Sequence, residues 1–385
     1  MIAYNPEWLS HLNIRKDADD AFDEYCITKE EREAIYKKYP VGFYSPNVFI
    51  GIGLLLLTII ILSFTFGLFA LMTGVSNEKA FGVLNLFFGA IAYTALEVMI
   101  REKKHYSSGV DEGLLWMASI AIFSGVWLLI EPGALASCIL IFILGLFGTV
   151  RYADRLMATV LYLSFVGILF YCCTKLGTAG KAIAPFMIMA ASLACYLLVK
   201  RSKLKRSLLN YMNCLTMIEI VALISLYAAG NYCVVRELSN EMFDLHLRPL
   251  DSIPLGWLFW IFTAIIPVIY LAIGIRNKNT ILIRVGLLLV AAIVFTVRYY
   301  HSILPIEVMM TVAGILILAI AYGLMKWLRK PVHGFTSNQL SSKNEPGKLQ
   351  IESLIIAQTF KPGTDVPDTK FGGGNFGGGG ASGDY

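Results

Sequence analysis

The residue with the clearest potential for chemistry is Glu219, a carboxylate in the middle of an apolar stretch. An ionisable side chain at membrane depth is costly and therefore marks a candidate functional site. Thr216 and Asn213 precede it at helical spacings and could donate hydrogen bonds to it. The sequence leaves two interpretations open. One is a proton or cation site, and the other is a structural glutamate that is protonated or hydrogen-bonded against a neighbouring helix.

A second set of polar residues stands at the ends of apolar stretches that we expect on the cytoplasmic side. It consists of His105, Asp111, Glu112, Asp154 and Arg155. Neighbouring helices could bring Asp111 and Arg155 together. The simpler alternative is that Asp111 and Glu112 only complement the dipole at the start of a helix, where negative charge is favourable.

A third set is expected on the opposite, periplasmic side and consists of Arg298, His301 and Glu307. The longest external loop, Asn231–Ile253, belongs to the same side. It holds three residues that could bind a metal weakly, namely Glu241, Asp244 and His246. A short surface helix is the simpler prediction for this loop. Such a helix would pack three apolar side chains on the bundle, Leu238, Met242 and Leu245.

None of the common catalytic or metal-binding templates occurs in the sequence. There is no HExxH helix, no P-loop and no GxSxG elbow. The apolar stretches contain neither Asp nor His, which argues against intramembrane aspartyl or serine proteolysis. The 7 Cys residues show no CxxC or CxxH spacing, so neither a zinc site nor a disulfide framework is expected. We therefore predict no enzymatic activity, no cofactor and no metal.

Composition places these residues in a membrane protein. Of 385 residues, 57% are apolar and only 15% are charged, whereas soluble domains carry about 25% charged residues. A helix needs about 20 mainly apolar residues to cross a bilayer, because no water there satisfies a free backbone group. Ten stretches qualify, which predicts an all-α, polytopic transmembrane helix bundle. They are Val48–Val75, Ala80–Ile100, Gly113–Ile130, Gly133–Val150, Leu156–Cys173, Ala182–Val199, Ser207–Gly230, Pro254–Ile275, Thr280–Val297 and Ile303–Met325.

Lys and Arg residues predict the orientation, because they accumulate in short cytoplasmic loops. With the N-terminus inside, most of the 32 Lys and Arg residues fall on the inner side, loop after loop. The densest basic run is Lys200–Arg206. This alternation predicts a multi-pass protein of the bacterial inner membrane with both termini in the cytoplasm. The formal charge of +5 then reflects orientation, so the expected partner is the lipid bilayer and not nucleic acid.

Residues 1–47 are predicted to form a small helical cap on the cytoplasmic side. Thr28 and Glu31 fit a capping box at the start of a helix that Pro40 ends. A short helix near Asp17–Tyr25 is expected before it. If the cap is structural, deletion of residues 1–40 destabilises the protein. If it is a separate docking module, the deletion only removes a partner.

The bundle, 48–325, is followed by a polar segment, 326–370, with room for one short helix, and by a glycine-rich tail, 371–385. So much glycine disfavours regular structure, because ordering glycine costs the most backbone entropy. The tail also carries aromatic residues that could anchor it in a groove or at a sheet edge of a partner. They are Phe371, Phe376 and Tyr385.

Several motifs resemble an uncharacterised family of bacterial polytopic inner-membrane proteins, classed as a domain of unknown function. They are Phe43–Asn47, His105–Trp116, Arg151–Arg155, Leu304–Glu307 and His333–Thr336. The resemblance covers about residues 1–340. It implies several helices in an inner membrane and supplies no activity or catalytic residue. The glycine-rich end is similar to the C-termini of some membrane proteins with a periplasmic TPM domain, although no TPM domain fits in this chain.

These observations favour a non-enzymatic membrane scaffold or adaptor that binds a membrane or cytoplasmic protein through its C-terminal tail. The alternative is a secondary transporter or an ion- or proton-coupled permease that uses Glu219. Ten spans divide into two sets of five, and Pro185 and Pro267 could break helices, as in transporters with inverted repeats. Against this alternative, the two halves show no internal sequence similarity.

Overall fold

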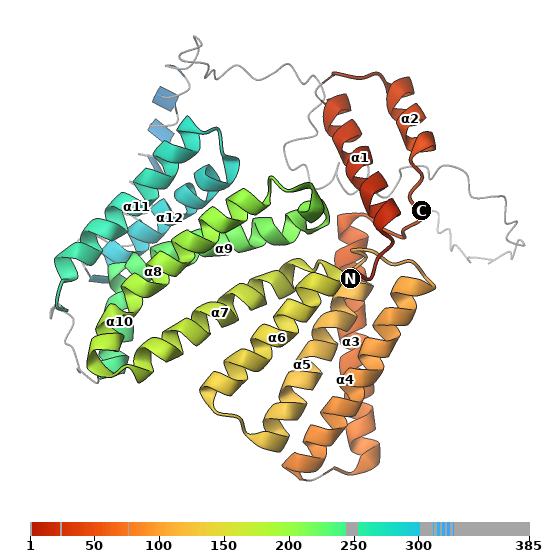
Figure 1. Cartoon of the computed structure of the whole chain (residues 1–385), viewed down its shortest axis with the longest axis horizontal. Helices are drawn as coiled ribbons and strands as arrows, with labels where there is room; N and C mark the ends of the chain where they lie inside the picture. Colours follow the sequence, from red (N-terminus) through yellow and green to blue (C-terminus); the bar gives the residue numbers. More distant parts are fainter. Residues whose placement is uncertain are drawn as a thin grey trace, which may run out of the picture. The chain divides into compact units, whose positions relative to one another are not determined.

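The computed structural model describes residues 2–23, 25–75, 77–243 and 253–300, together with single residues between 311 and 326. Every regular element within these residues is a helix, so the described part is all-α, as predicted (Figure 1). Several predictions fall elsewhere. Outside the described residues lie most of the tenth span, the polar segment after it, and the tail with Phe371, Phe376 and Tyr385.

The second helix of the predicted cap is α2, Lys29–Lys38, and its capping box is confirmed. The Thr28 hydroxyl accepts a hydrogen bond from the amide of Glu31 (3.3 Å), and the Glu31 carboxylate accepts one from the amide of Thr28 (2.8 Å). α2 ends two residues before Pro40, as expected. These reciprocal bonds fix where the helix begins.

The first helix of the cap is α1, Pro6–Asp23, and it is much longer than the predicted Asp17–Tyr25. The side chain of Asn5 accepts a hydrogen bond from the amide of Glu7 (2.9 Å). Proline suits the first turn of a helix, where its missing N–H is not needed. The sequence interpretation overlooked this Asn-Pro start.

The N-terminal segment packs on one end of the bundle. Tyr4 meets Tyr106 edge to face with 4.9 Å between ring centroids, and Phe43 stacks on Tyr106 at 5.0 Å. Arg15 of α1 donates to the main-chain oxygens of Tyr36 and Tyr39 (both 2.8 Å), which holds α1 against α2. We call this end the cap side. It comprises residues 2–47 and the interhelical junctions 102–109, 153–154 and 203–211.

Nine helices among the described residues are long and apolar enough to cross a membrane, so the chain is a multi-pass membrane protein. Their bounds match the first nine predicted spans to within a few residues, except that a 3-10 turn, η1 (Arg206–Tyr211), precedes α9. They are α3 (Val48–Thr73), α4 (Glu78–Arg101), α5 (Val110–Ile130), α6 (Ala134–Tyr152), α7 (Arg155–Lys175), α8 (Gly177–Ser202), α9 (Met212–Gly230), α11 (Gly256–Arg276) and α12 (Thr280–Tyr300).

The prediction that Pro185 and Pro267 break helices is wrong. Pro185 lies inside the continuous helix α8, and Pro267 lies inside α11. Both residues are buried against neighbouring helices. Membrane helices tolerate an internal proline because their surroundings can satisfy the freed backbone groups.

Consecutive spans pack as hairpins, α4 with α5, α6 with α7, α8 with α9, and α11 with α12. Small residues allow the backbones to approach. A Cβ atom on Gly125 would lie 2.9 Å from the carbonyl oxygen of Gly82, between α4 and α5. A Cβ atom on Gly145 would lie 2.8 Å from the amide nitrogen of Leu161, between α6 and α7. Such contacts are typical of helix packing in membranes.

Helix α3 contacts the rest of the bundle mainly through α5. A Cβ atom on Gly109 would lie 2.0 Å from the carbonyl oxygen of Gly51, and Gly109 has a φ of +87°. Only glycine satisfies both the space and the backbone angle. None of the α3 residues, all of which the structure describes, is buried. The helix is therefore fixed most closely beside junction 102–109, and it also contacts α5 through Thr58 and α4 through Phe66.

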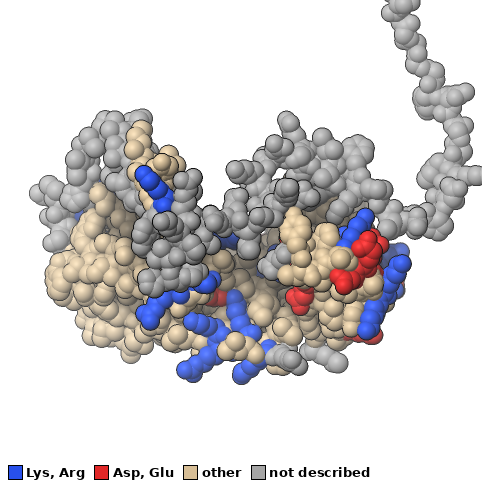
Figure 2. Space-filling view, turned by 90° about the horizontal axis from the view of Figure 1, so that it is seen from above, with Lys and Arg blue, Asp and Glu red and all other residues tan. Residues whose placement is uncertain are grey.

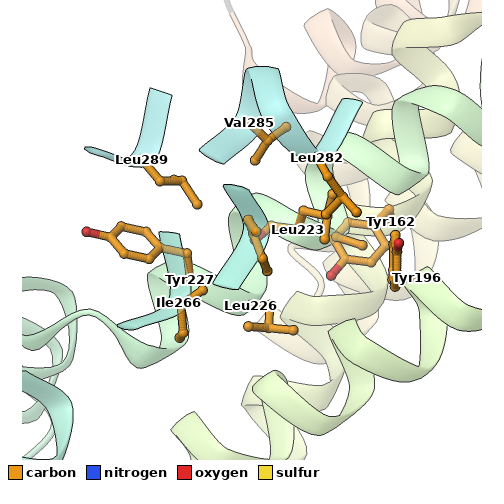
Figure 3. Packing of buried hydrophobic residues seen from close by; sticks show 11 residues of the cluster. Tyr162, Tyr196, Leu223, Leu226, Tyr227, Ile266, Leu282, Val285 and Leu289 are labelled. Carbon is orange, nitrogen blue, oxygen red and sulfur yellow. The ribbon is translucent and has the colours of Figure 1, made fainter. Parts of the chain in front are cut away.

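A large buried cluster joins α7, α8, α9, α11 and α12 (Figure 3). Polar atoms within it are satisfied. Tyr162 donates to Ser192 Oγ (2.9 Å), and Tyr270 donates to the main-chain oxygen of Leu223 (3.1 Å). A second cluster joins residues from α4 to α7 with the N-terminal segment. It includes Tyr4, Leu9, Leu96, Leu115, Tyr152 and Met157.

The predicted surface helix in loop Asn231–Ile253 is confirmed as α10, Tyr232–Phe243, but it buries a different face. Its buried residues are Tyr232, Val235 and Arg236, whereas Leu238 and Met242 are half-buried. The ring of Tyr232 stacks on Trp260 of α11 at 4.8 Å, and this contact sets the inward face. Outside the described residues lie Asp244, Leu245 and His246.

Candidate binding site on the cap side

A small polar cavity lies on the cap side, where α5 and α7 begin. Its volume is ≈ 30 Å³, which is room for about two water molecules. It brings together four of the residues predicted for this side, and Asn213 joins them. We call it the polar pocket. Its lining consists of Tyr4, Tyr106, Ser107, Asp111, Glu112, Leu115, Tyr152, Ala153, Asp154, Arg155 and Asn213.

Asp111 is the structural centre of the polar pocket, and only 3% of it is exposed. It accepts hydrogen bonds from Tyr4 Oη (3.0 Å), from Ser108 Oγ (2.9 Å) and from the amides of Ser107 and Ser108 (both 2.9 Å). Burial and the neighbouring Asp111 carboxylate raise the pKa of Tyr4 well above its ordinary value, so Tyr4 stays a donor. Asp111 therefore ties the N-terminal segment and junction 102–109 to the start of α5.

Asp154 caps the start of α7. Its carboxylate accepts hydrogen bonds from the amide of Met157 (2.7 Å) and from the indole nitrogen of Trp116 (3.2 Å). Burial raises the pKa of Asp154 above its ordinary value. Because Asp154 fixes the first turn of α7, it also fixes the backbone position of Arg155, the next residue.

Asp111 and Arg155 both line the polar pocket, as predicted, but they do not form an ion pair. Four donors already occupy the Asp111 carboxylate. Arg155 lines the polar pocket, yet it makes no ion pair with any residue that the structure describes. Glu112 accepts one hydrogen bond, from Ser107 Oγ (3.2 Å), and is likewise unpaired within the described ranges. The pocket thus holds one cation and three carboxylates, none of them in an ion pair within the described residues, and Glu112 accepts the fewest hydrogen bonds of the three.

A wide groove adjoins the polar pocket, and we call it the cap groove. The two cavities share five lining residues, Tyr106, Ser107, Glu112, Arg155 and Asn213. The groove has a volume of ≈ 1210 Å³, which exceeds the roughly 300–1,000 Å³ typical of small-molecule sites. Figure 2 views the molecule from this side, and basic and acidic side chains are both gathered there. The cap groove is therefore the largest candidate site that we describe.

The cap groove has a charged wall and an apolar wall. The charged residues from α1 are Arg15, Lys16, Asp17, Asp19 and Asp20. The apolar wall runs along α3, whose residues Val48, Gly51, Ile52 and Leu55 follow one another at helical spacing. Leu209 of η1 and Met212 of α9 add apolar surface. This pairing of walls suits an amphiphilic ligand.

His105, the fifth residue predicted for this side, does not line either cavity. Its Nδ1 lies 2.7 Å from Ser108 Oγ, and its ring packs against Tyr44 with 4.9 Å between centroids. Tyr44 and His105 also form an isolated parallel β-bridge. His105 therefore braces junction 102–109 against the cap.

Glu97 contacts several side chains, and only one of these contacts is local in the sequence. The i,i+4 spacing of Glu97 and Arg101 favours a local ion pair, and 3.2 Å separates Arg101 Nε from Glu97 Oε2. The other oxygen accepts hydrogen bonds from Arg151 (2.7 and 2.9 Å), Tyr152 (2.7 Å) and Tyr93 (3.1 Å). Arg151 and Tyr152 end α6, so this carboxylate links α4 to α6. No periodic signal in the sequence indicates that pairing.

Glu219 is buried, with 3% exposure, and forms an ion pair with Lys203. Neither predicted partner bonds to it. Thr216 donates to the main-chain oxygen of Met212 (2.8 Å), and Asn213 lines the polar pocket. Because α9 begins at Met212 and not at Ser207, Glu219 lies about two helical turns from the cap-side end. It is therefore shallower than expected and within reach of a lysine after α8.

On the opposite side, the described residues include Arg298 of the predicted set, half-buried in α12, while His301 and Glu307 lie outside them. A buried network that the sequence interpretation missed lies nearby. Asn231 donates to Tyr227 Oη (2.9 Å) and to Thr296 Oγ1 (3.0 Å). Within the described ranges, no group of three or more His, Cys, Asp or Glu residues is arranged to hold a metal ion.

Comparison with protein-family models, with curated proteins and with solved structures gave no match. The resemblance to an uncharacterised membrane-protein family therefore stays a prediction. The function rests on the geometry of the cap side.

Proposed function

We propose that this multi-pass protein is a non-enzymatic scaffold or adaptor of the bacterial inner membrane, with both termini and the cap side in the cytoplasm. It binds its ligands at the cap groove and through the tail, 371–385. The tail lies outside the described residues, so its role rests on the sequence. The cap groove is the part that the geometry supports.

The distribution of unpaired charges supports this proposal best. Glu97 and Glu219 are paired with Arg151 and Lys203, and the buried Asp111 and Asp154 are satisfied by hydrogen bonds. Arg155, in contrast, is exposed in the cap groove and lacks an ionic partner in the described part of the chain. Charges that serve structure are paired or hydrogen-bonded, whereas free polar groups in a preformed cavity are available for a ligand.

Basic residues support a cytoplasmic cap side. Lys103 and Lys104 stand in junction 102–109, and Arg151 and Arg155 flank the turn between α6 and α7. The run Lys200–Arg206 begins in the last turn of α8 and reaches the start of η1. Short loops rich in Lys and Arg face the cytoplasm. The polar pocket and the cap groove then open to the cytoplasm and to the inner leaflet.

The adaptor function is tested by purifying the tagged protein from membranes and quantifying the proteins that accompany it. The comparison chain keeps the composition of residues 371–385 in scrambled order. We expect at least one accompanying protein to fall about tenfold or more with the scrambled tail, because the three aromatic anchors lose their spacing. Identical protein sets from the two chains contradict the adaptor proposal.

A secondary transporter or coupled permease is the second candidate, and the buried Glu219 supports it. It predicts that Glu219→Gln abolishes substrate or proton flux in proteoliposomes without unfolding the protein. Under the adaptor proposal the same change leaves Lys203 unpaired and lowers the free energy of unfolding by about 1–3 kcal/mol. The double variant Glu219→Gln with Lys203→Gln leaves no unpaired charge. It should therefore recover part of the lost stability. Flux that depends on Glu219 decides for the transporter.

A further inference from the structure

The geometry points to a zwitterionic, ethanolamine-type phospholipid as the ligand of the cap groove, with its phosphate on Arg155 and its ammonium group beside Glu112. This inference rests on the proposed function only in taking the cap groove as a binding site. It goes further by assigning the chemistry of the ligand to Arg155 and Glu112, the two charged side chains that line both the polar pocket and the cap groove.

Donors without partners converge where the polar pocket meets the cap groove. Arg155, Asn213 and Tyr106, each of which carries a side-chain donor, line both cavities. None of the three makes a side-chain hydrogen bond to another residue in the described part of the chain. Phosphate oxygens accept such donors, and a guanidinium can bind two of them at once. The unpaired donors therefore favour a phosphate group.

The acids of the polar pocket divide into two that are occupied and one that is available. Asp111 accepts four hydrogen bonds, and Asp154 caps α7 and accepts from Trp116. Glu112 accepts only one, from Ser107 Oγ. It shares both cavities with Arg155. Glu112 and Arg155 line the same two cavities without a direct ion pair, which matches a headgroup that carries both an ammonium and a phosphate, as phosphoethanolamine does.

The apolar wall matches the acyl chains of such a ligand. Val48, Ile52 and Leu55 lie at spacings of three to four residues, on one face of α3. Val48 is 69% exposed and Ile52 is 51% exposed. The wall belongs to a candidate membrane span none of whose residues is buried in the protein. An acyl chain can therefore pass from the bilayer along α3 while the headgroup stays at the polar pocket.

A free anion or a peptide fits these features less well. Inorganic phosphate would satisfy Arg155 but would leave Glu112 and the apolar face of α3 without a role. A peptide would expose backbone groups to the apolar wall, where no hydrogen-bond partners are available. A lipid uses the cation, the anion and the apolar face together.

The test is native mass spectrometry of the delipidated full chain in detergent, titrated with a short-chain phosphatidylethanolamine. Parallel titrations use phosphatidylglycerol with the same chains, O-phosphoethanolamine and inorganic phosphate. The variants are Arg155→Gln and Glu112→Gln. The matched control is Arg284→Gln, because Arg284 is also an exposed arginine but lies on α12 and lines neither cavity. Thermal unfolding in the same detergent checks that each variant is folded.

We expect phosphatidylethanolamine to bind the native chain and the Arg284→Gln variant equally. Arg155→Gln should weaken it about ten- to a hundredfold, because a charge-assisted contact is lost. Glu112→Gln should remove the preference over phosphatidylglycerol. Equal binding by native and Arg155→Gln chains overturns the inference, as does equal or tighter binding of either soluble phosphate. Loss of an accompanying protein with Arg155→Gln, without loss of lipid, assigns the groove to a protein and also overturns it.

These outcomes are separate from those of the tail experiment. If phosphatidylethanolamine does not bind while the scrambled tail still loses a protein, the lipid inference fails and the adaptor proposal stands. If the lipid binds with the expected dependence on Arg155 while the native and scrambled tails give identical sets of accompanying proteins, the adaptor proposal fails and the lipid site stands.

Discussion

Replacing Asp111 with alanine is expected to release the N-terminal segment from the bundle and to lower the free energy of unfolding by about 2–4 kcal/mol. The carboxylate is buried and accepts from Tyr4, from Ser108 and from two main-chain amides. Alanine leaves these donors without an acceptor, and each buried orphan costs about 1–3 kcal/mol. Ser107 is exposed, so water can replace part of its bond. Chemical unfolding in detergent measures the loss, and limited proteolysis detects the released segment.

Two variants distinguish the loss of the Asp111 hydrogen bonds, which hold the N-terminal segment, from a general effect of removing a charge. Tyr4→Phe removes one of the four hydrogen bonds and should cost about 1 kcal/mol. Glu112→Ala removes the adjacent carboxylate, which accepts a single hydrogen bond, and should cost less than Asp111→Ala. If Asp111→Ala and Glu112→Ala unfold at the same denaturant concentration, the Asp111 hydrogen bonds do not hold the N-terminal segment on the bundle. The docked geometry also favours destabilisation, and not mere loss of a partner, when residues 1–40 are deleted.

Replacing Glu97 with alanine is the second change with a large expected effect, a loss of about 2–4 kcal/mol in the free energy of unfolding. Arg151, Tyr152 and Tyr93 all donate to one oxygen of this carboxylate. The Glu97 side chain is 16% exposed and that of Arg151 is 29% exposed. This partial access to solvent keeps the expected cost below that of a fully buried pair. Equilibrium unfolding in detergent measures it.

A double-mutant cycle tests whether the coupling runs between helices. Glu97→Ala and Arg151→Ala together should cost less than the sum of the two single changes, because the double variant leaves no unpaired charge. The neighbouring Arg101→Ala is the control. Its side chain is 71% exposed, so it should change stability very little. Strict additivity between Glu97 and Arg151 contradicts a structural ion pair.

Local features of this fold could be predicted from the sequence because their causes are local. The apolar length of a span and the capping box of Thr28 and Glu31 depend on neighbours within a few residues. The pair of Glu97 and Arg101 is likewise four positions apart. In both pairs, helix geometry alone brings together side chains that are three or four positions apart.

Long-range polar contacts could not be predicted, because they depend on which helices become neighbours. Arg151 is 54 positions from Glu97, and Asn231 is 65 positions from Thr296. The pairing of Lys203 with Glu219 depended on where α9 begins, and the 3-10 turn before it moved that start to Met212. The cap groove needed contributions from the cap, α3, α5, α7 and α9. The sequence identified Asp111 and Arg155 as residues that come together on one side, but it could not indicate which donors occupy Asp111.

The central claim is that the bundle spans a membrane with its cap side in the cytoplasm. Cys26, which is exposed at the end of the cap hairpin, tests it most directly once the other cysteines are replaced by alanine. A Gly133→Cys variant without Cys26 reports on the opposite side, in the turn between α5 and α6, where a new Cβ atom meets no other residue within 4 Å. We predict that a membrane-impermeant maleimide labels position 133 in intact cells and labels Cys26 only after permeabilisation. Labelling of Cys26 in intact cells contradicts a cytoplasmic cap side, and labelling of both positions from one side contradicts a membrane-spanning bundle.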